Sequence, residues 1–403
     1  MCPLICAVII SPTVGFLYIP SMPHPSFNNR ESSLPLRVAM IGGGSGGHLF
    51  PAIAVAQHLL SQHPETSMLF LVSHRPVDTQ VMTSAGWPDV RVQVQPYVSL
   101  KSGSSMTSRL AMIPSALRAM RAARLALTAF QPDVAVGVGA FASVPGVIAA
   151  SRRNIPIALL EQNSVPGRAT WFLAKRAAVT IAGLPFEAGY ADGWPCRLEV
   201  IGTPVRRAIA DLADRRVSSH AERPRLLILG GSQGAHAVNR LILEALADGR
   251  CLPGEWSIVH QTGESDVQSV TREYARLGQS ARVVAFLSDM PSELARASIA
   301  VSRAGAVTLQ ELACAGVPSI LIPLSTAAHG HQIRNARCVA AGGGSMIVDE
   351  TDERAAVKLQ EMLKTLMAES SVRDHMRAAI RESAHPDAAA QVATVIRSIV
   401  EST

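Results

Sequence analysis

One local pattern occurs twice in this 403-residue chain, and it restricts the possible folds more than any other feature. Each copy is a short apolar run, a glycine-rich turn and a helix-like stretch: LRVAMIGGGSGGHLFPAIAVAQHLL from residue 36 and RLLILGGSQGAHAVNRLILEAL from residue 225. Apolar runs without alternation are typical of strands that are buried on both faces of a parallel sheet. The repeat therefore predicts two α/β units, each of which opens with a strand, a turn and a helix.

Further apolar runs follow each copy and extend it into a sheet. They span 68–73, 133–139 and 155–161 in the first half, and 256–263, 283–288, 297–305 and 318–324 in the second half. The polar stretch 202–224 lies between the halves and contains Pro204 and Pro224, so it marks the predicted join. We predict an N-terminal domain over residues 36–203, a C-terminal domain over residues 204–386 and an amphipathic helix over residues 387–402 that could pack on either domain.

The first 35 residues differ from the rest of the chain. The segment from Pro3 to Pro20 is apolar, but it is interrupted by Pro12 and Gly15, and the first basic residue is Arg30. A secretory signal begins with a basic region, and a spanning helix needs about 20 clean apolar residues. We expect residues 1–35 to be a disordered leader, and a membrane anchor or a cleaved signal remain the alternatives.

Composition removes some classes of function. Aromatic residues make up only 4% of the chain, which argues against an RNA-stacking surface. The formal net charge of +6 is compatible with a nucleic acid, an anionic membrane or a phosphorylated substrate and does not choose among them. The six cysteines are widely spaced apart from Cys2 and Cys6, which indicates a reducing compartment.

The two glycine turns are candidate phosphate sites, because glycines let backbone N–H groups approach an anion at the start of a helix. In the first turn, Gly42, Gly44 and Gly47 have the spacing of a dinucleotide-binding motif. The next strand ends in Ser-His-Arg rather than in an acidic residue, so a nicotinamide cofactor is not favoured, although Arg75 could suit NADP. In the second turn, Ser232 could donate to a phosphate, and a tight turn without a ligand is the alternative.

His48 ends the first glycine turn, at the start of the predicted helix. The positive end of a helix dipole lowers the pKa of a histidine and favours a neutral imidazole that can accept a proton. His48 is therefore a candidate general base. The alternative is a histidine that only caps or packs.

Three polar groups follow buried strands, at the carboxyl ends where ligands bind in open α/β sheets. Glu161, Gln162 and Asn163 follow the run 155–161. In the stretch 302–323 the first-turn amides form an anion site, and Glu311 suits two ribose hydroxyls. The third group is Gln332 and Asn335, whose amides suit sugar hydroxyls. Polar loops and solvated helix faces are the alternatives.

The stretch from Val90 to Pro132 contains no acidic residue. Its basic residues are Arg91, Lys101, Arg109, Arg118, Arg121 and Arg124, and they alternate with apolar ones. A basic surface beside exposed apolar residues suits anionic lipid headgroups. A helix that packs on its own core with a solvated basic face is the alternative.

Several catalytic motifs are absent from the sequence. No Asp-x-Asp occurs, so the metal–diphosphate motif of one glycosyltransferase class is missing. Walker A and His-Glu-x-x-His patterns are missing as well.

The segments GGGSGGHLFPAIAVA, LLEQNSVPGRA, GTPVR, GGSQGA and RAGAVTLQELACAGVPSILIP, in this order, resemble the MurG family. The resemblance extends from Leu36 to the C-terminus and implies a GT-B fold, in which two Rossmann-like domains with parallel sheets face a cleft. It implies inverting transfer of N-acetylglucosamine from UDP-GlcNAc to the C4 hydroxyl of undecaprenyl-pyrophosphoryl-MurNAc-pentapeptide (lipid I), which gives lipid II. It implies no metal on the diphosphate, no cofactor and no nucleic acid. The implied location is peripheral, on an anionic membrane surface at the cytoplasmic face of the bacterial inner membrane.

The resemblance also implies roles for individual residues. His48 matches the candidate base, and Leu287 matches a position whose backbone meets uracil. The loop for the donor or the acceptor diphosphate contains Ser45, Gly46 and Gly47. Asn163, Arg206 and Ser232 match other donor-contacting positions. The helix that meets the diphosphate and the ribose contains Ala306, Val307, Thr308, Leu309, Gln310 and Glu311. Gln332 matches a contact to the transferred sugar.

The chain departs from the family pattern at three places. His331 stands where a glutamine is frequent, Leu160 stands where a histidine is frequent, and residues 139–143 read GAFAS where the family has Gly-Gly-Tyr-x-Ser. We expect these changes to affect acceptor contacts more than the donor pocket. A UDP-N-acetylglucosamine 2-epimerase of similar fold and a non-catalytic nucleotide-sugar-binding subunit are the alternative functions.

Overall fold

The computed structural model describes residues 35–44, 46–73, 75, 78, 82, 113–215, 223–231, 234–247, 255–327 and 330–402, and the backbone of 90–95. The predicted leader lies outside these residues, apart from Pro35. So do Ser45, Ser232 and the part of the predicted basic stretch between 96 and 112.

The first predicted pattern forms a seven-stranded sheet with the order β3-β2-β1-β4-β5-β6-β7, in which all strand pairs are parallel. The strands are β1 (Arg37–Ile41), β2 (Ser67–Ser73), β3 (Val90–Gln95), β4 (Val134–Gly137), β5 (Ile157–Glu161), β6 (Val179–Ala182) and β7 (Arg197–Val200). The four predicted strands are present. The strands β3, β6 and β7 are additional, because β3 and β7 alternate apolar and polar residues and Thr180 interrupts the apolar residues of β6.

The second pattern forms a six-stranded parallel sheet with the order β10-β9-β8-β11-β12-β13. The strands are β8 (Arg225–Leu229), β9 (Ser257–Gln261), β10 (Ala281–Val284), β11 (Ile299–Ser302), β12 (Ser319–Leu321) and β13 (Ser345–Ile347). The prediction of a strand over 283–288 was wrong beyond Val284, where β10 ends. The edge strand β10 pairs only with β9, and β9 ends at Gln261, which lies opposite Val284.

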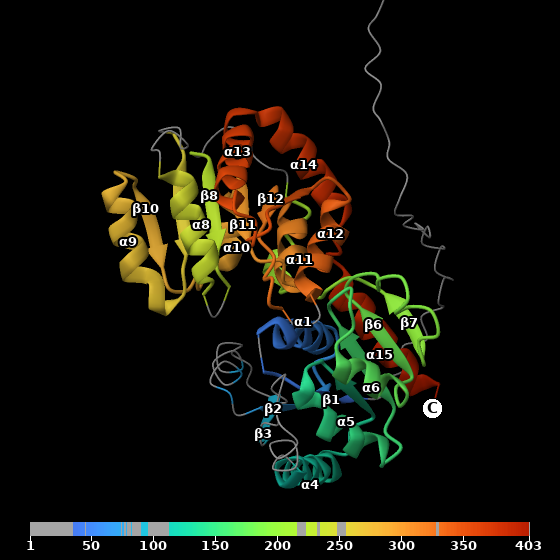
Figure 1. The fold of residues 1–403 in the computed structure, drawn as a ribbon. Coiled ribbons are helices and arrows are strands. Elements are labelled where there is room, and N and C mark those ends of the chain that lie inside the picture. The colour runs from blue at the N-terminus through green and yellow to red at the C-terminus, as the bar shows by residue number, and fades with distance from the viewer. Residues whose placement is uncertain are drawn as a thin grey trace, which may run out of the picture. The chain divides into compact units, whose positions relative to one another are not determined.

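Helices connect and cover the strands of both sheets, as Figure 1 shows. They are α1 (Gly46–Gln62), α4 (Ile113–Phe130), α5 (Val144–Ser151), α6 (Arg168–Ala174), α7 (Arg207–Ala210), α8 (His236–Leu246), α9 (Val267–Arg276), α10 (Met290–Arg296), α11 (Ala306–Ala315), α12 (His331–Ala340), α13 (Ala355–Ala368), α14 (Ser370–Glu382) and α15 (Ala388–Glu401). None of the helices in the described residues is long and apolar enough to cross a bilayer.

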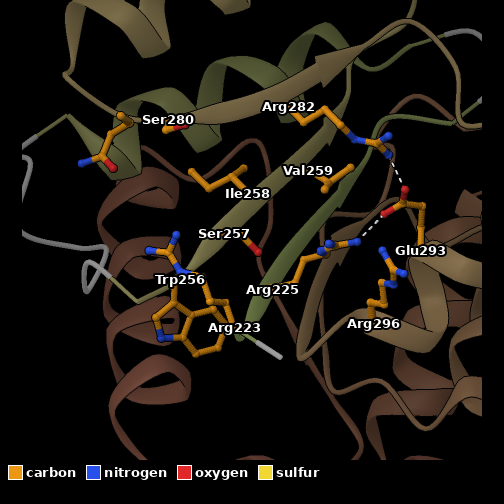
Figure 2. Close-up of a pocket in the computed structure, with 11 residues that line it drawn as sticks. Arg223, Arg225, Trp256, Ser257, Ile258, Val259, Ser280, Arg282, Glu293 and Arg296 are labelled. Atoms are coloured by element: carbon orange, nitrogen blue, oxygen red, sulfur yellow. Dashed lines mark hydrogen bonds and ion pairs between the residues drawn. The ribbon is translucent and has the colours of Figure 1, made fainter. Parts of the chain in front are cut away.

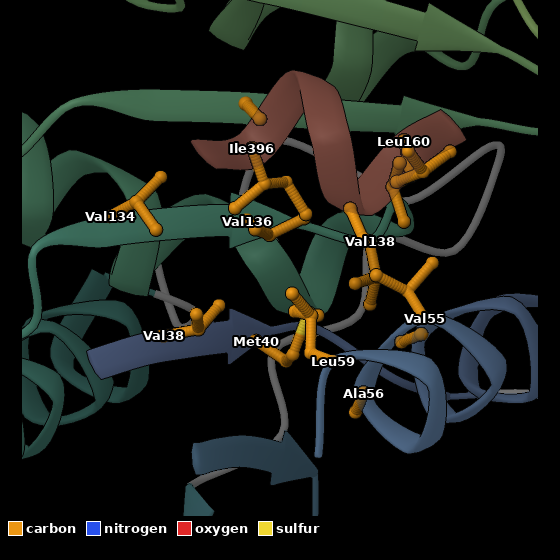
Figure 3. Packing of buried hydrophobic residues seen from close by; sticks show 14 of the residues in the cluster. Val38, Met40, Val55, Ala56, Leu59, Val134, Val136, Val138, Leu160 and Ile396 are labelled. Carbon is orange, nitrogen blue, oxygen red and sulfur yellow. The ribbon is translucent and has the colours of Figure 1, made fainter. Parts of the chain in front are cut away.

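The last helix of the chain belongs to the core of the first sheet. Figure 3 shows Ile396 of α15 among Val38 and Met40 of β1 and Val136 of β4. All four side chains are essentially buried. On the other side of β1, Ala39 and Ile41 pack in a second cluster with α4 and α5. The first strand is therefore buried on both faces, as its continuous apolar sequence predicts.

Shortening Ile396 to alanine should destabilise the protein by about 2–5 kcal/mol, because it leaves a cavity against β1 and β4. Urea unfolding followed by circular dichroism measures the change. Thr394→Ala on the exposed face of the same helix is the matched control and should stay within about 0.5 kcal/mol of the wild type. Equal stability of Ile396→Ala and the wild type would contradict this assignment of the core.

Candidate active site

The first glycine turn, after β1, already holds a carboxylate. The amide of Gly44 donates to both carboxylate oxygens of Asp78, over 2.8 and 2.7 Å. The hydroxyl of Ser73 donates to the same carboxylate over 2.5 Å. Gly43 has φ +145°, and a Cβ on it would lie 2.5 Å from Asp78 Oδ2. This part of the turn is thus occupied by the protein itself, and no motif in the sequence indicates this contact.

His48 lies in the first turn of α1 and is half-buried. Burial lowers its pKa below the usual value for histidine; the charge of Glu161 opposes this shift, and His331 adds to it. The sequence indicated a neutral ring through the helix dipole, and the structure adds desolvation as a cause.

Because Gly139 has no side chain, its backbone lies close to the Nδ1 edge of the His48 ring. Gly139 has φ +88°, and a Cβ on it would stand 2.9 Å from His48 Nδ1. A hydrogen bond between the ring and the backbone of Val138 raises the pKa of His48, against the larger effect of burial. If Nδ1 carries the proton, Nε2 is the ring atom that can accept another one.

Glu161 anchors the loop after β5. Its side chain is 3% exposed. Oε1 accepts from the backbone and side-chain amides of Asn163 over 3.1 and 3.0 Å, and Oε2 accepts from Gly167 N over 2.9 Å and Thr170 Oγ1 over 2.6 Å. The carboxylate is therefore used within the protein, and it sets the position of Asn163.

Asn335 differs from the sequence interpretation, which suggested a contact to sugar hydroxyls. Its side chain is 0% exposed. Oδ1 accepts from the amide and the hydroxyl of Ser164, each over 3.0 Å, and Nδ2 donates to Asn163 Oδ1 over 3.0 Å. Nδ2 also lies 3.4 Å from the carbonyl oxygen of Ala304. Asn335 thus ties the loop after β5 to α12.

Arg206 and Glu311, two predicted donor contacts, lie together. Arg206 Nη2 donates to Glu311 Oε1 over 3.2 Å, and Arg206 Cζ lies 5.2 Å from the centre of the Phe50 ring. Glu311 is 8% exposed; its burial raises its pKa, and the charge of Arg206 opposes that shift. Phe50 was missed because nothing in the sequence links it to a residue so distant in the chain.

The start of α11 divides the predicted residues into two groups. Gly305 caps the helix without any side-chain hydrogen bond, so the amides of Ala306, Val307 and Thr308 have no intrahelical partner. Leu309 and Gln310 follow these three residues, the amide of Leu309 donates to the carbonyl of Gly305 within the helix, and Gln310 Nε2 lies 3.5 Å from Cys314 Sγ. The first group can bind an anion, and the second supports the helix.

Gln332 and Leu287 each use part of their binding capacity within the protein. Gln332 Oε1 accepts from Leu324 N over 3.0 Å, which leaves its amide nitrogen without a described partner. The side chain of Leu287 is buried in the core beside β8 and α11, so only its backbone could meet a ligand. Within the described residues no group of three or more His, Cys, Asp or Glu side chains is arranged to hold a metal.

We predict that the pKa of the His48 imidazole lies below the usual histidine value of 6.5, because the ring is desolvated by burial. NMR of the ring should show titration below 6.5, with His48→Gln used to assign the signals. The folded pKa is lowered, so stability falls as pH drops below 6.5, where the unfolded chain binds a proton that the folded one does not. His48→Gln should reduce this dependence. Titration at or above 6.5 would contradict the predicted environment.

Comparisons with known proteins agree with this architecture. The glycosyltransferase family 28 N-terminal domain matches residues 38–181, and the family's C-terminal domain matches residues 225–392. A crystal structure of MurG from Acinetobacter baumannii superposes with a TM-score of 0.69 at 26% identity and covers 90% of this chain and 100% of that one. These matches confirm the predicted GT-B fold with two α/β domains.

Two other proteins bear on the alternatives. UDP-GlcNAc 2-epimerase from Neisseria meningitidis superposes with a TM-score of 0.62 at only 13% identity, over 91% of this chain and 100% of that one, which shows a shared fold alone. The UDP-N-acetylglucosamine--N-acetylmuramyl-(pentapeptide) pyrophosphoryl-undecaprenol N-acetylglucosamine transferase of Anaeromyxobacter dehalogenans (strain 2CP-C) is 34% identical over 365 residues, which cover 91% of this chain and 93% of that relative. Through this likeness across almost its whole length, the chain belongs to the MurG family of glycosyltransferases.

Proposed function

We propose that this protein transfers N-acetylglucosamine from UDP-N-acetylglucosamine to the lipid-linked N-acetylmuramyl-pentapeptide acceptor lipid I and thereby forms lipid II. The observation that carries the proposal is the 34% identity, over 91% of the chain, to a relative named for this transfer. The likeness to an epimerase is one of fold alone, so this alternative has less support.

Residues 204–386 form the proposed donor domain. The free amides of Ala306, Val307 and Thr308 and the helix dipole of α11 suit the diphosphate of UDP. Glu311 must be ionised to accept hydrogen bonds from two ribose hydroxyls. Its burial works against the ionised form, and Arg206 counteracts that effect over 3.2 Å.

His48 is the proposed general base. Its Nε2 takes the proton from the C4 hydroxyl of the acceptor while the oxygen forms a bond to C1 of the sugar on the opposite face from UDP. The bond from C1 to the diphosphate breaks, and UDP leaves with its electron pair. The α11 amides stabilise the charge that develops on the diphosphate. A neutral ring at working pH is required for this step, and the burial of His48 favours it.

Residues 36–203 form the proposed acceptor domain. The amide of Gly44 is bonded to Asp78, so a diphosphate at the first glycine turn would meet the amides around Gly46 and Gly47 instead. The carboxylate of Asp78 would repel an anion placed at Gly44. This arrangement favours the amides around Gly46 and Gly47, at the start of α1, as the place where the acceptor diphosphate binds.

The helix α4 is the proposed membrane contact. Its inner face is buried through Ala123 and Leu127, and its outer face exposes Leu117 (56%) and Leu125 (62%). Exposed arginines share this outer face, namely Arg118, Arg121 and Arg124. One side of α4 therefore packs on the core of the protein, and the other side presents arginines and leucines to the solvent. Apolar side chains among arginines suit a peripheral contact with the anionic cytoplasmic leaflet.

The function is tested with labelled UDP-GlcNAc and a short-chain lipid I analogue. Product should require both substrates. His48→Ala should lower kcat by about 10²–10⁴-fold and leave the donor KM nearly unchanged, whereas His58→Ala near the other end of α1 should keep normal turnover. Turnover of UDP-GlcNAc without acceptor would indicate an epimerase, and UDP binding without turnover would indicate a non-catalytic subunit. A normal kcat in His48→Ala would contradict the assignment of His48 as the general base.

The membrane contact is tested by sedimentation with phosphatidylglycerol vesicles. The double variant Arg121→Gln/Leu125→Gln should bind several-fold more weakly, since each basic residue near an anionic surface contributes about 1 kcal/mol. Arg272→Gln/Val357→Gln, which removes one exposed arginine and one exposed apolar residue from the other domain, is the matched control. Equal loss in both double variants would contradict a specific role of α4.

A further inference from the structure

A basic pocket lies at the amino ends of β8, β9 and β10. Its lining includes Arg225 and Ser257, the first residues of β8 and β9, and Arg282, the second residue of β10. The candidate active site follows the carboxyl ends of strands in the same sheet. The pocket is therefore at the opposite end of the strands, and its described lining contains none of the predicted donor-binding residues.

The register of the strands explains why the arginines converge. Arg225 pairs with Ser257 across β8 and β9, and Arg282 pairs with Val259 across β9 and β10. Side chains two residues apart lie on the same face of a strand, so Arg225, Ser257, Val259 and Arg282 share one face. The strands β8 and β10, which flank β9, thus each hold one guanidinium group, as Figure 2 shows.

A single carboxylate serves both of these guanidinium groups. Glu293 of α10 accepts from Arg225 Nη1 over 2.7 Å through Oε2, and it accepts from Arg282 Nη2 through Oε1. Arg225 Nε is buried and has no hydrogen-bond partner among the described residues. The remaining charged residues of the described lining are Arg223 and Arg296, so this lining contains four arginines and one glutamate. Positive charge prevails in the described lining.

The size and shape of the pocket restrict the ligand. Its volume is about 500 Å³, within the range of sites for small molecules. Guanidinium groups bind phosphate through paired hydrogen bonds, which makes arginine the preferred side chain for planar, two-point contacts to this group. The polar side chains of Ser257, Gln279 and Ser280 also line it and can meet hydroxyl groups.

We propose that this pocket binds a small phosphate-bearing anion, at a site separate from the one for UDP-N-acetylglucosamine. Arg225 and Arg282 contact the phosphate, and Glu293 holds the two guanidinium groups in place between β8 and β10 while the site is empty of ligand. The serine and glutamine side chains face the rest of the molecule.

The test is calorimetric titration of the full chain with inorganic pyrophosphate and, separately, with glucose 1-phosphate. UDP is present at saturation, so that the donor site does not contribute. We expect a binding event at the pocket, and the variants distinguish it from any contact of pyrophosphate with the first glycine turn. Arg282→Gln, which changes a half-exposed side chain, should weaken binding by about tenfold, the usual effect of losing one charge-assisted contact. If only pyrophosphate binds, the ligand is an inorganic phosphate. If both pyrophosphate and glucose 1-phosphate bind, the pocket accepts an organic phosphate.

Two further variants keep the test independent of folding. Ser280→Asp adds a negative charge at the exposed rim and leaves every arginine in place, and it should also weaken binding several-fold. Arg276→Gln at the end of α9 is the matched control, because Arg276 pairs with Glu273 outside the pocket, and it should bind like the wild type. Absence of binding to the wild type, or equal affinity of the wild type, Arg282→Gln and Ser280→Asp, would overturn the proposal.

Discussion

The candidate active site depends on the hydrogen bonds of two buried polar side chains, Glu161 and Asn335. A buried carboxylate or amide is costly unless each of its atoms has a partner, and both residues satisfy this requirement with loop atoms. Glu161 fixes the backbone after β5, and Asn335 attaches that loop to α12. Asn163 lies between them and bonds to both, so its position follows from their geometry.

Much of the fold could be predicted from the sequence, because strands buried on both faces leave continuous apolar runs. This signal identified β1, β2, β4 and β5 and their counterparts in the second half. It fails for β3 and β7, where apolar residues alternate with polar ones, and for β6, where Thr180 interrupts the apolar residues. The end of β10 depends on where its neighbour β9 stops, which is a tertiary property.

The site was less accessible to sequence reasoning. Glycine turns and the glutamate one turn into α11 are local signals, and they place the predicted site at the carboxyl ends of the strands of the two sheets. The contacts that give these residues their chemistry join distant segments: Asp78 lies 34 residues from Gly44, and Glu311 lies 105 residues from Arg206. The departure at His331 illustrates the same limit, since the structure places its charge within range of His48.

The position of α15 has a consequence for how this protein is made on the ribosome. The strand β1 leaves the ribosome before the other described strands, and its core also needs Ile396 and its neighbours in α15, which is synthesised after all of the described strands. During translation the part of the first sheet that α15 covers therefore stays exposed until the second sheet has emerged, and of the described helices only α1 packs on that side of the sheet before then. Nascent chains of this protein therefore expose an apolar surface for most of their synthesis, and they are a natural target for chaperones that bind such surfaces.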